Sequence, residues 1–217
     1  MPGDTMRALF IGNSFTARND LPGMIARMAA AAAGEQFNYR LISAGGASLR
    51  RHWNGGVALR EIQSGGYDRV VLQEQSTLPI KNAVRMHENV RLFDDAIRAA
   101  GSRLVLYMTW ARRSDPESQA QITNAYQAIG SELGAAVIPA GLAWESVLRL
   151  HPDIVLHDRD GSHPTLAGTY LAACAAFAVL FGRPSTASAP VDGLSAKDAD
   201  ILRRAAGLAV SGTTARR

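Results

Sequence analysis

The chain has 217 residues, of which 47% are hydrophobic and 19% are charged. These proportions are those of an ordinary soluble globular protein, and the length suits a single domain spanning residues 1–217. One cysteine, Cys174, excludes a disulfide framework or a cysteine metal site within one chain, and its apolar surroundings predict a packed core thiol. The net charge of +4 arises from arginines spread between acidic residues, so it does not predict nucleic-acid binding.

Short apolar runs alternate with longer helical patterns along the chain, which is typical of βαβ units and a parallel sheet. Strands are predicted at residues 6–11, 37–42, 69–72, 104–109 and 136–139. Helices are predicted at residues 21–33, 56–63, 82–100, 116–133, 142–150, 165–181 and 195–209, bounded by capping residues and glycines. We therefore predict an α/β fold, a three-layer α/β/α sandwich. Its five parallel strands should lie in the flavodoxin-like order 2-1-3-4-5, with the C-terminal helix docked back on the sandwich.

The predicted core covers about residues 6–184, and the C-terminal helix and tail cover residues 185–217. Within that tail, residues 185–190 have a linker composition, and the end is expected to fray from residue 211. The longest apolar stretch, residues 171–181, is too short to span a bilayer, and the N-terminal apolar run is too short for a signal peptide. We predict no membrane insertion, and we expect the chain as given to be cytoplasmic unless a secretion signal has been removed from it.

A serine and a distant histidine are the most informative residues of the chain. The run at residues 8–11 predicts a buried strand, and the sharp turn after it leaves the Ser14 hydroxyl at the carboxyl edge of the sheet. Open α/β sheets bind their ligands at that edge. His163 is a candidate base for the hydroxyl, and Asp160, three residues earlier, is a candidate to orient its ring. Alone, Ser14 would cap a turn or hold a phosphate, but the combination predicts a serine hydrolase.

These residues resemble the SGNH, or GDSL-type, hydrolases, whose four sequence blocks have candidates in the same order across roughly the whole chain. Gly12-Asn13-Ser14 resembles the first block, with Asn13 where many members have Asp. Gly45-Gly46 resembles the second block, whose glycine donates a backbone N–H to the oxyanion. Asp160-Gly161-Ser162-His163 resembles the last block, with its Asp-x-x-His spacing. The resemblance implies a catalytic set of Ser14, Asp160 and His163, and oxyanion donors at Ser14 and Gly46, with Gly45 as the alternative to Gly46.

The third block departs from the family pattern. The usual Gly-x-Asn-Asp is absent, and Gln73-Glu74-Gln75-Ser76 follows the predicted third strand instead. This segment resembles the glutamine-containing third block of carbohydrate acetylesterases within the superfamily, which implies that a glutamine amide replaces the asparagine as an oxyanion donor. Gln73 lies nearest the strand end and is the first choice for this donor, with Gln75 as the second.

The signals for substrate recognition are fewer. Trp110 and Arg112 follow the fourth strand, so they should lie at the same edge and could stack on a sugar or hold an anionic group. The alternative is that Trp110 packs under a loop and Arg112 is solvated. No broad apolar loop suits a long acyl chain, which favours a short acyl group such as acetyl. The predicted substrate-binding residues are Asn13, Trp110 and Arg112.

The resemblance implies a serine esterase, a carboxylic ester hydrolase that needs no metal and no organic cofactor. Its expected partner is a short-acyl ester of a carbohydrate or small molecule. One alternative keeps the triad and acts on longer acyl groups, as a lysophospholipase or thioesterase. Another is a non-catalytic module that binds an anion or a sugar at the turn before Ser14; the Asp160 and His163 pair argues against it, because a phosphate site has no use for an oriented base. The remaining histidines, His52, His87, His151 and His157, have no partner at a useful spacing, and His87 and His151 are predicted to lie on the surface.

Overall fold

The structure is a computed structural model that describes residues 5–32, 36–184, 191 and 193–214. A single sheet of five parallel strands runs in the order β2-β1-β3-β4-β5, which confirms the predicted order. β4 and β5 end earlier than predicted, because Tyr107 and Ile138 form the last pair between them. The strands are β1 (Met6–Gly12), β2 (Phe37–Ser43), β3 (Arg69–Leu72), β4 (Arg103–Tyr107) and β5 (Ala136–Ile138).

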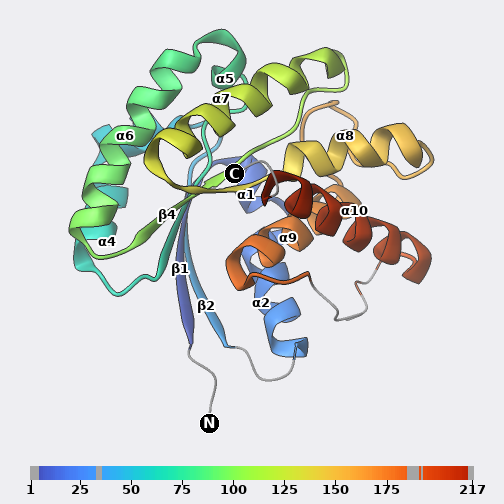
Figure 1. The fold of residues 1–217 in the computed structure, drawn as a ribbon, viewed down its shortest axis with the longest axis horizontal. Helices are drawn as coiled ribbons and strands as arrows, with labels where there is room; N and C mark the ends of the chain where they lie inside the picture. Colours follow the sequence, from blue (N-terminus) through green and yellow to red (C-terminus); the bar gives the residue numbers. More distant parts are fainter. Residues whose placement is uncertain (1–4, 33–35, 185–190, 192, 215–217) are drawn as a thin grey trace.

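Helices cover both faces of the sheet, which gives the three layers of the predicted sandwich (Figure 1). One layer holds α2 (Leu21–Ala31), α8 (Ala140–Leu150), α9 (Leu166–Phe181) and α10 (Ala196–Thr214). The other layer holds α3 (Leu49–Gly55), α4 (Val57–Ser64), α6 (Ala83–Ala99) and α7 (Gln119–Leu133).

Residues 8–11 of the central strand β1 are apolar without interruption. Successive side chains of a strand point to opposite faces. Ala8 and Phe10 therefore pack into the core under α2 and α9, whereas Leu9 and Ile11 pack into the core under α4 and α6. All four side chains are fully buried, because helices cover both faces of this parallel sheet.

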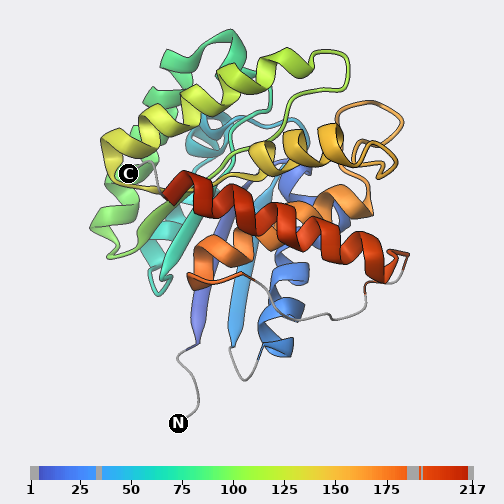
Figure 2. The same ribbon diagram turned by 45° about the vertical axis from the view of Figure 1, so that its right-hand side comes forward.

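Helix α9 is buried on nearly all sides because α2, α8 and α10 pack around it. Figure 2 shows α10 lying across this layer, docked back on the sandwich. Cys174 is a free, buried thiol within α9, as predicted. Helix α10 continues to Thr214, so residues 211–214 are helical rather than frayed. The predicted linker, residues 185–190, and residues 215–217 lie outside the described residues.

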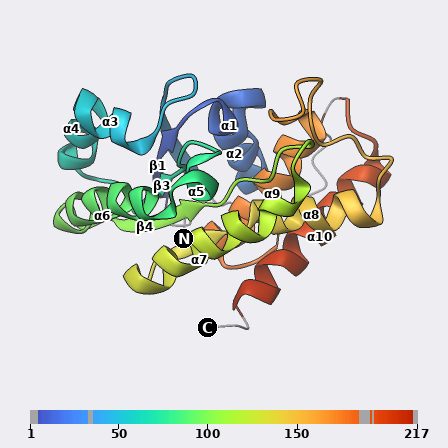
Figure 3. The ribbon, with the colours of Figure 1, turned by 90° about the horizontal axis from the view of Figure 1, so that it is seen from above.

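No helix in the described part of the chain is both long enough and apolar enough to cross a bilayer. Short helices that the sequence patterns do not predict gather instead at the carboxyl edge of the sheet, the edge that Figure 3 views from above. Besides α3, these are α1 (Ser14–Ala17), η1 (Arg18–Asp20), α5 (Leu78–Lys81) and η2 (Pro116–Ser118). Ser14 lies in α1, and the other candidate site residues lie in loops that meet at this edge.

Candidate active site

The turn after β1 places Ser14 at the first position of α1, at the carboxyl edge of the sheet. Asn13 caps α1, because its side-chain oxygen accepts a hydrogen bond from the backbone N–H of Phe15 at 3.0 Å. The amide nitrogen of Asn13 donates to the carbonyl oxygen of Ala47 at 3.0 Å, and the residue is only 2% exposed. Both ends of the Asn13 side chain are therefore used to join the two loops of the site. This contradicts the prediction that Asn13 binds substrate.

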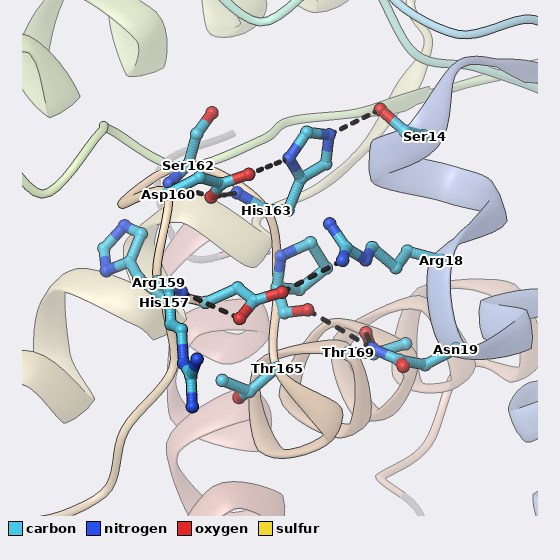
Figure 4. Close-up of polar contacts among 12 residues, drawn as sticks. Ser14, Arg18, Asn19, His157, Arg159, Asp160, Ser162, His163, Thr165 and Thr169 are labelled. Carbon is cyan, nitrogen blue, oxygen red and sulfur yellow. Dashed lines mark hydrogen bonds and ion pairs between the residues drawn. The ribbon is translucent and has the colours of Figure 1, made fainter.

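Ser14, His163 and Asp160 form a chain of hydrogen bonds, although Ser14 lies far from the other two in the sequence (Figure 4). The Ser14 hydroxyl lies 2.8 Å from Nε2 of His163, and Nδ1 of His163 lies 2.5 Å from Oδ2 of Asp160. An ionised carboxylate can only accept, so Nδ1 carries the proton of the neutral ring and Nε2 accepts from Ser14. This is the arrangement in which a histidine can take a proton from a serine.

The Asp160 carboxylate is held in its ionised form. The hydrogen bond from the His163 ring, together with those from the backbone N–H groups of His163 and Ser162, keeps the pKa of Asp160 well below its usual range. The side chains of His163 and Asp160 are 28% and 47% exposed, so the pair lies open to solvent at the rim of the sheet. A permanently charged Asp160 can stabilise an imidazolium that forms beside it.

The loop that carries His163 and Asp160 is fastened from several sides. The backbone N–H of Asp158 donates to the carbonyl oxygen of His163 at 2.8 Å, which closes the loop on itself. The Arg113 guanidinium donates to the carbonyl oxygens of His157 and Asp158 at 2.9 and 2.8 Å. Arg18, one turn after Ser14, forms an ion pair with Asp158 at 3.0 Å (Figure 4). These contacts fix the distance between Ser14 and His163.

Trp110 belongs to this support and offers no face to a substrate. It is 2% exposed, and its ring stacks on Trp144 with centroids 3.8 Å apart and planes 2° apart. On the other side it lies 5.1 Å from the ring of Phe15, which in turn lies 5.3 Å from the ring of His163. Its indole N–H donates to the carbonyl oxygen of Ser162 at 3.0 Å. The prediction that Trp110 stacks on a sugar is therefore replaced by the alternative of packing under a loop.

Arg112 lies in the loop after β4, and its role as a substrate contact stays a prediction. The residue is exposed, and its guanidinium has no ion pair or hydrogen bond to any of the described residues. It borders two hollows, one of about 720 Å³ between the loop after β4 and α8, and one of about 110 Å³ between the loops after β3 and β4. The larger hollow has apolar walls that include Leu148, Val155 and Leu156.

The two predicted glycines form an exposed turn beside Ser14. The backbone N–H of Ala47 donates to the carbonyl oxygen of Ala44 at 3.1 Å, and Gly46 adopts φ of 62°, a conformation that favours glycine. The turn is tied to the Ser14 turn through the contact between Asn13 and Ala47. Across the described ranges, the backbone N–H of Gly46 has no hydrogen-bond partner, so it is free to donate to a ligand.

The two glutamines after β3 differ sharply in environment. Gln73 is 1% exposed; its oxygen accepts from the Asn13 backbone N–H and the Thr16 hydroxyl, both at 2.9 Å, and its nitrogen donates to the Glu74 carbonyl oxygen. Gln75 is partly exposed; its oxygen accepts from Thr77, and its nitrogen has no partner among the residues described. Gln73, the first choice for the oxyanion donor, thus uses its amide inside the scaffold, whereas the second choice, Gln75, keeps its amide nitrogen available to a ligand.

Sequence reasoning missed two buried residues that hold the site together. His52 in α3 is 9% exposed, and its Nε2–H donates to the carbonyl oxygen of Gly12 at 2.7 Å; burial lowers the pKa of its ring. Glu74 is 1% exposed, and burial raises the pKa of its carboxyl although three N–H donors oppose that shift. The only signal in the sequence was that His52 follows the second block and Glu74 lies in the third. Their hydrogen-bond partners lie in other parts of the sequence, so neither role could be predicted.

Two of the remaining histidines also bond to the interior. His157 is 3% exposed and its Nε2–H donates to the carbonyl oxygen of Ala111 at 2.9 Å. His87, predicted to lie on the surface, is partly buried and bonds to the carbonyl oxygen of Ala125 at 2.8 Å. Neither ring contacts Ser14, so both are structural.

The sheet order and the hydrogen-bonded set of Ser14, His163 and Asp160 resemble those of SGNH-type hydrolases. Solved structures agree with this class. The chain is 26% identical to a candidate SGNH hydrolase from Slackia heliotrinireducens, with a TM-score of 0.71 over 82% of this chain and 100% of that one. The resemblance to the SGNH superfamily seen in the sequence is thereby confirmed.

Two further structures share the fold. A DUF4886 family protein from Bacteroides uniformis is 20% identical, with a TM-score of 0.78 over 96% of this chain and 95% of that one. An acetyl xylan esterase from Geobacillus stearothermophilus is 18% identical, with a TM-score of 0.62 over 83% of this chain and 97% of that one. No family model and no curated protein sequence matches the chain.

Proposed function

We propose that the chain is a serine esterase that hydrolyses a short-acyl ester, such as an acetyl ester of a carbohydrate or small molecule. The observation that carries this proposal is the hydrogen-bonded series from the Ser14 hydroxyl through His163 to Asp160 at the carboxyl edge of the sheet. A module that only binds an anion has no need of such a series, because nothing in binding requires a base beside the hydroxyl.

In the proposed mechanism, Nε2 of His163 takes the proton of Ser14 while the Ser14 oxygen attacks the ester carbonyl carbon. Asp160 stabilises the imidazolium that results. The oxyanion of the tetrahedral intermediate accepts hydrogen bonds from the backbone N–H groups of Ser14 and Gly46 and from the Gln75 amide. The intermediate collapses as His163 returns the proton to the leaving alcohol, which leaves the acyl group on Ser14. Water, deprotonated by the same ring, then attacks the acyl group and releases the acid and free Ser14.

Two observations support a short acyl group. The hollow of about 110 Å³ lies beside the Gln75 loop, where Ser76 and Thr77 form part of its wall. This hollow has less than a sixth of the volume of the larger one, so it favours the smaller acyl group. Among the structures that share the fold, one is an acetyl xylan esterase.

A longer acyl chain is the second candidate. The hollow of about 720 Å³ with apolar walls could take such a chain, and another structure of this fold, from Enterococcus faecalis, is a lipase/acylhydrolase. Comparing the hydrolysis of p-nitrophenyl acetate and p-nitrophenyl octanoate distinguishes the two. A higher kcat/KM for the acetyl ester supports the first candidate, and a higher value for the octanoyl ester supports the second.

The proposal as a whole is tested by Ser14→Ala. This change should lower kcat on p-nitrophenyl acetate by about 10⁴-fold or more and abolish labelling by a fluorophosphonate probe. Ser131→Ala, on the exposed side of α7, is the matched control and should leave both unchanged. If the Ser14 variant folds and retains more than about a twentieth of the rate, Ser14 is not the nucleophile.

A further inference from the structure

A buried carboxylate lies between the two loops that carry the proposed oxyanion donors. Glu74 is 1% exposed. Its Oε1 accepts hydrogen bonds from the backbone N–H of Gln75 at 2.6 Å and of Leu49 at 3.0 Å. Its Oε2 accepts from the side-chain amide of Asn89 in α6 at 2.8 Å. The carboxylate thus joins the loop after β3, the start of α3 and the middle of α6.

An ionised carboxylate is costly to bury, and no cation among the described residues forms an ion pair with this one. The positive charge that acts on Glu74 is that of Arg50, which lowers the pKa of the Glu74 carboxyl. The Nε–H of Arg50 donates to Asn89 Oδ1 at 2.9 Å, so Asn89 lies between the two charged groups. Removing a buried acceptor alone leaves its N–H donors without a partner, which is destabilising, and Glu74 serves three of them. The contribution of Glu74 is therefore to be sought in what its hydrogen bonds hold in place.

What they hold is the spacing of the two loops. Gln75 carries the amide proposed to meet the oxyanion, and its backbone N–H is bound by Glu74. Leu49 begins α3, immediately after the segment of Gly46, Ala47 and Ser48, and its backbone N–H is bound by the same oxygen of Glu74. One atom therefore connects the loop of the side-chain donor with the loop of the backbone donor.

We propose that Glu74 is a positioning residue that presets the oxyanion hole by fixing the Gln75 loop against the Gly46 turn. The inference rests on the proposed function. Donors that are already aimed at the developing charge need no reorganisation during the reaction, and small errors in their placement are expensive. Glu74 touches no substrate, so its effect should fall on the transition state and leave substrate binding nearly unchanged.

The test compares Glu74→Leu with Glu74→Gln in the full chain, using p-nitrophenyl acetate. Glu74→Leu removes every acceptor, and we expect kcat to fall by about 10- to 100-fold, less than for loss of a donor itself, with KM within about threefold. Glu74→Gln keeps an oxygen for Leu49 and Gln75, and should stay within about 10-fold of the wild-type kcat. The rate of fluorophosphonate labelling, which also places an oxygen in the oxyanion hole, should fall in step with kcat.

Asp94→Asn is the matched control, because Asp94 is a 4% exposed carboxylate on α6, the helix of Asn89, and pairs with Arg98 away from the site. It should alter the melting temperature but not kcat. The inference is overturned if folded Glu74→Leu keeps kcat within about threefold of wild type, or if its KM rises as much as its kcat falls.

If Glu74→Leu fails to fold, Asn89→Ala takes its place, because it removes one of the three donors to Glu74. It should lower kcat in the same direction by a smaller factor, and an unchanged kcat would overturn the inference. The parent proposal has a separate outcome: a wild-type protein that neither hydrolyses any ester nor reacts with the probe would end both, whereas an active wild type with unaffected Glu74 variants would end only this one.

Discussion

The indole N–H of Trp110 donates to the carbonyl oxygen of Ser162, the residue before His163, at 3.0 Å. This bond ties the loop after β4 to the loop that carries the proposed base. The Trp110 ring is also clasped between Phe15 and Trp144, so the orientation of His163 depends on a buried aromatic stack that begins next to Ser14.

Trp110→Phe should therefore impair catalysis more than folding. The ring stack survives, but the Ser162 carbonyl loses its donor, at a cost of about 1 kcal/mol in the free energy of unfolding. Looser placement of His163 should lower kcat by roughly 10-fold, since an error of about 1 Å can cost about 100-fold. Urea unfolding and p-nitrophenyl acetate turnover measure the two effects. Trp144→Phe is the control, because its buried indole N–H has no partner in the described residues; an equal fall in kcat there would contradict the role of the Trp110 hydrogen bond.

Two buried histidines should make the protein less stable on mild acidification. Burial lowers the pKa of both His52 and His157 from the ordinary value of 6.5. Between the folded and unfolded pKa values, these histidines are protonated in the unfolded chain but not in the folded chain. The free energy of unfolding therefore falls as the pH drops below about 6.5, and it levels off below the folded pKa values. We expect a steady loss between about pH 7 and pH 5 in urea unfolding. His52→Gln should have a shallower slope than the wild type, and a slope that does not change would contradict this reading.

Asp160→Asn should lower kcat by about 10³- to 10⁴-fold while preserving the fold. The asparagine oxygen can still accept the backbone N–H bonds of the loop, but it can no longer hold the His163 proton on Nδ1 or stabilise the imidazolium. Circular dichroism and ester turnover are the measurements. Asp153→Asn, an exposed acid in the same interhelical loop, should leave the rate unchanged.

The pKa of Asp160 also makes a stability prediction with a definite sign. Because that pKa is lowered from its ordinary value of 3.8, the folded state gains stability from the charged form above this pH and loses it as the pH falls further. Wild type should thus be more stable than Asp160→Asn near neutral pH, and the difference should shrink as the pH falls below about 4. A difference that grows on acidification would show that the lowered pKa is not linked to folding.

Arg112→Ala should act on substrate choice alone. Arg112 is exposed and borders both hollows, and its guanidinium has no ion pair or hydrogen bond to the described residues, so its removal should cost no measurable stability. If it holds an anionic group, KM should rise by about 10-fold for an ester that carries a carboxylate and stay unchanged for p-nitrophenyl acetate. Equal effects on both esters would mean that Arg112 does not recognise charge.

Strands β1, β3 and β4 could be predicted because they are largely buried on both faces and so appear as apolar runs, whereas the edge strand β2 is largely exposed. Ser14, His163 and Asp160 could be selected because each follows a local motif. Helix α3 could not be predicted, since seven residues are too few to show a helical period. Without this helix, the hydrogen bond between His52 and Gly12 could not be predicted either. The hydrogen bonds from Leu49 to Glu74 and from Trp110 to Ser162 join residues that are 25 and 52 positions apart, and only the folded chain brings these partners together.

The choice between Gln73 and Gln75 could not be made from the sequence, and it gives a prediction that two variants can test. Both glutamines follow β3, and nothing local says which one turns outward. Gln75→Ala should lower kcat by about 100- to 1,000-fold and the melting temperature only slightly, because it removes a donor without a partner among the described residues and an acceptor for the partly buried Thr77. Gln73→Ala should instead reduce the free energy of unfolding by about 1–3 kcal/mol, because it strands the buried N–H of Asn13. Urea unfolding and turnover on both variants decide the matter, and a stable Gln73→Ala with the larger loss of kcat would restore Gln73 as the donor.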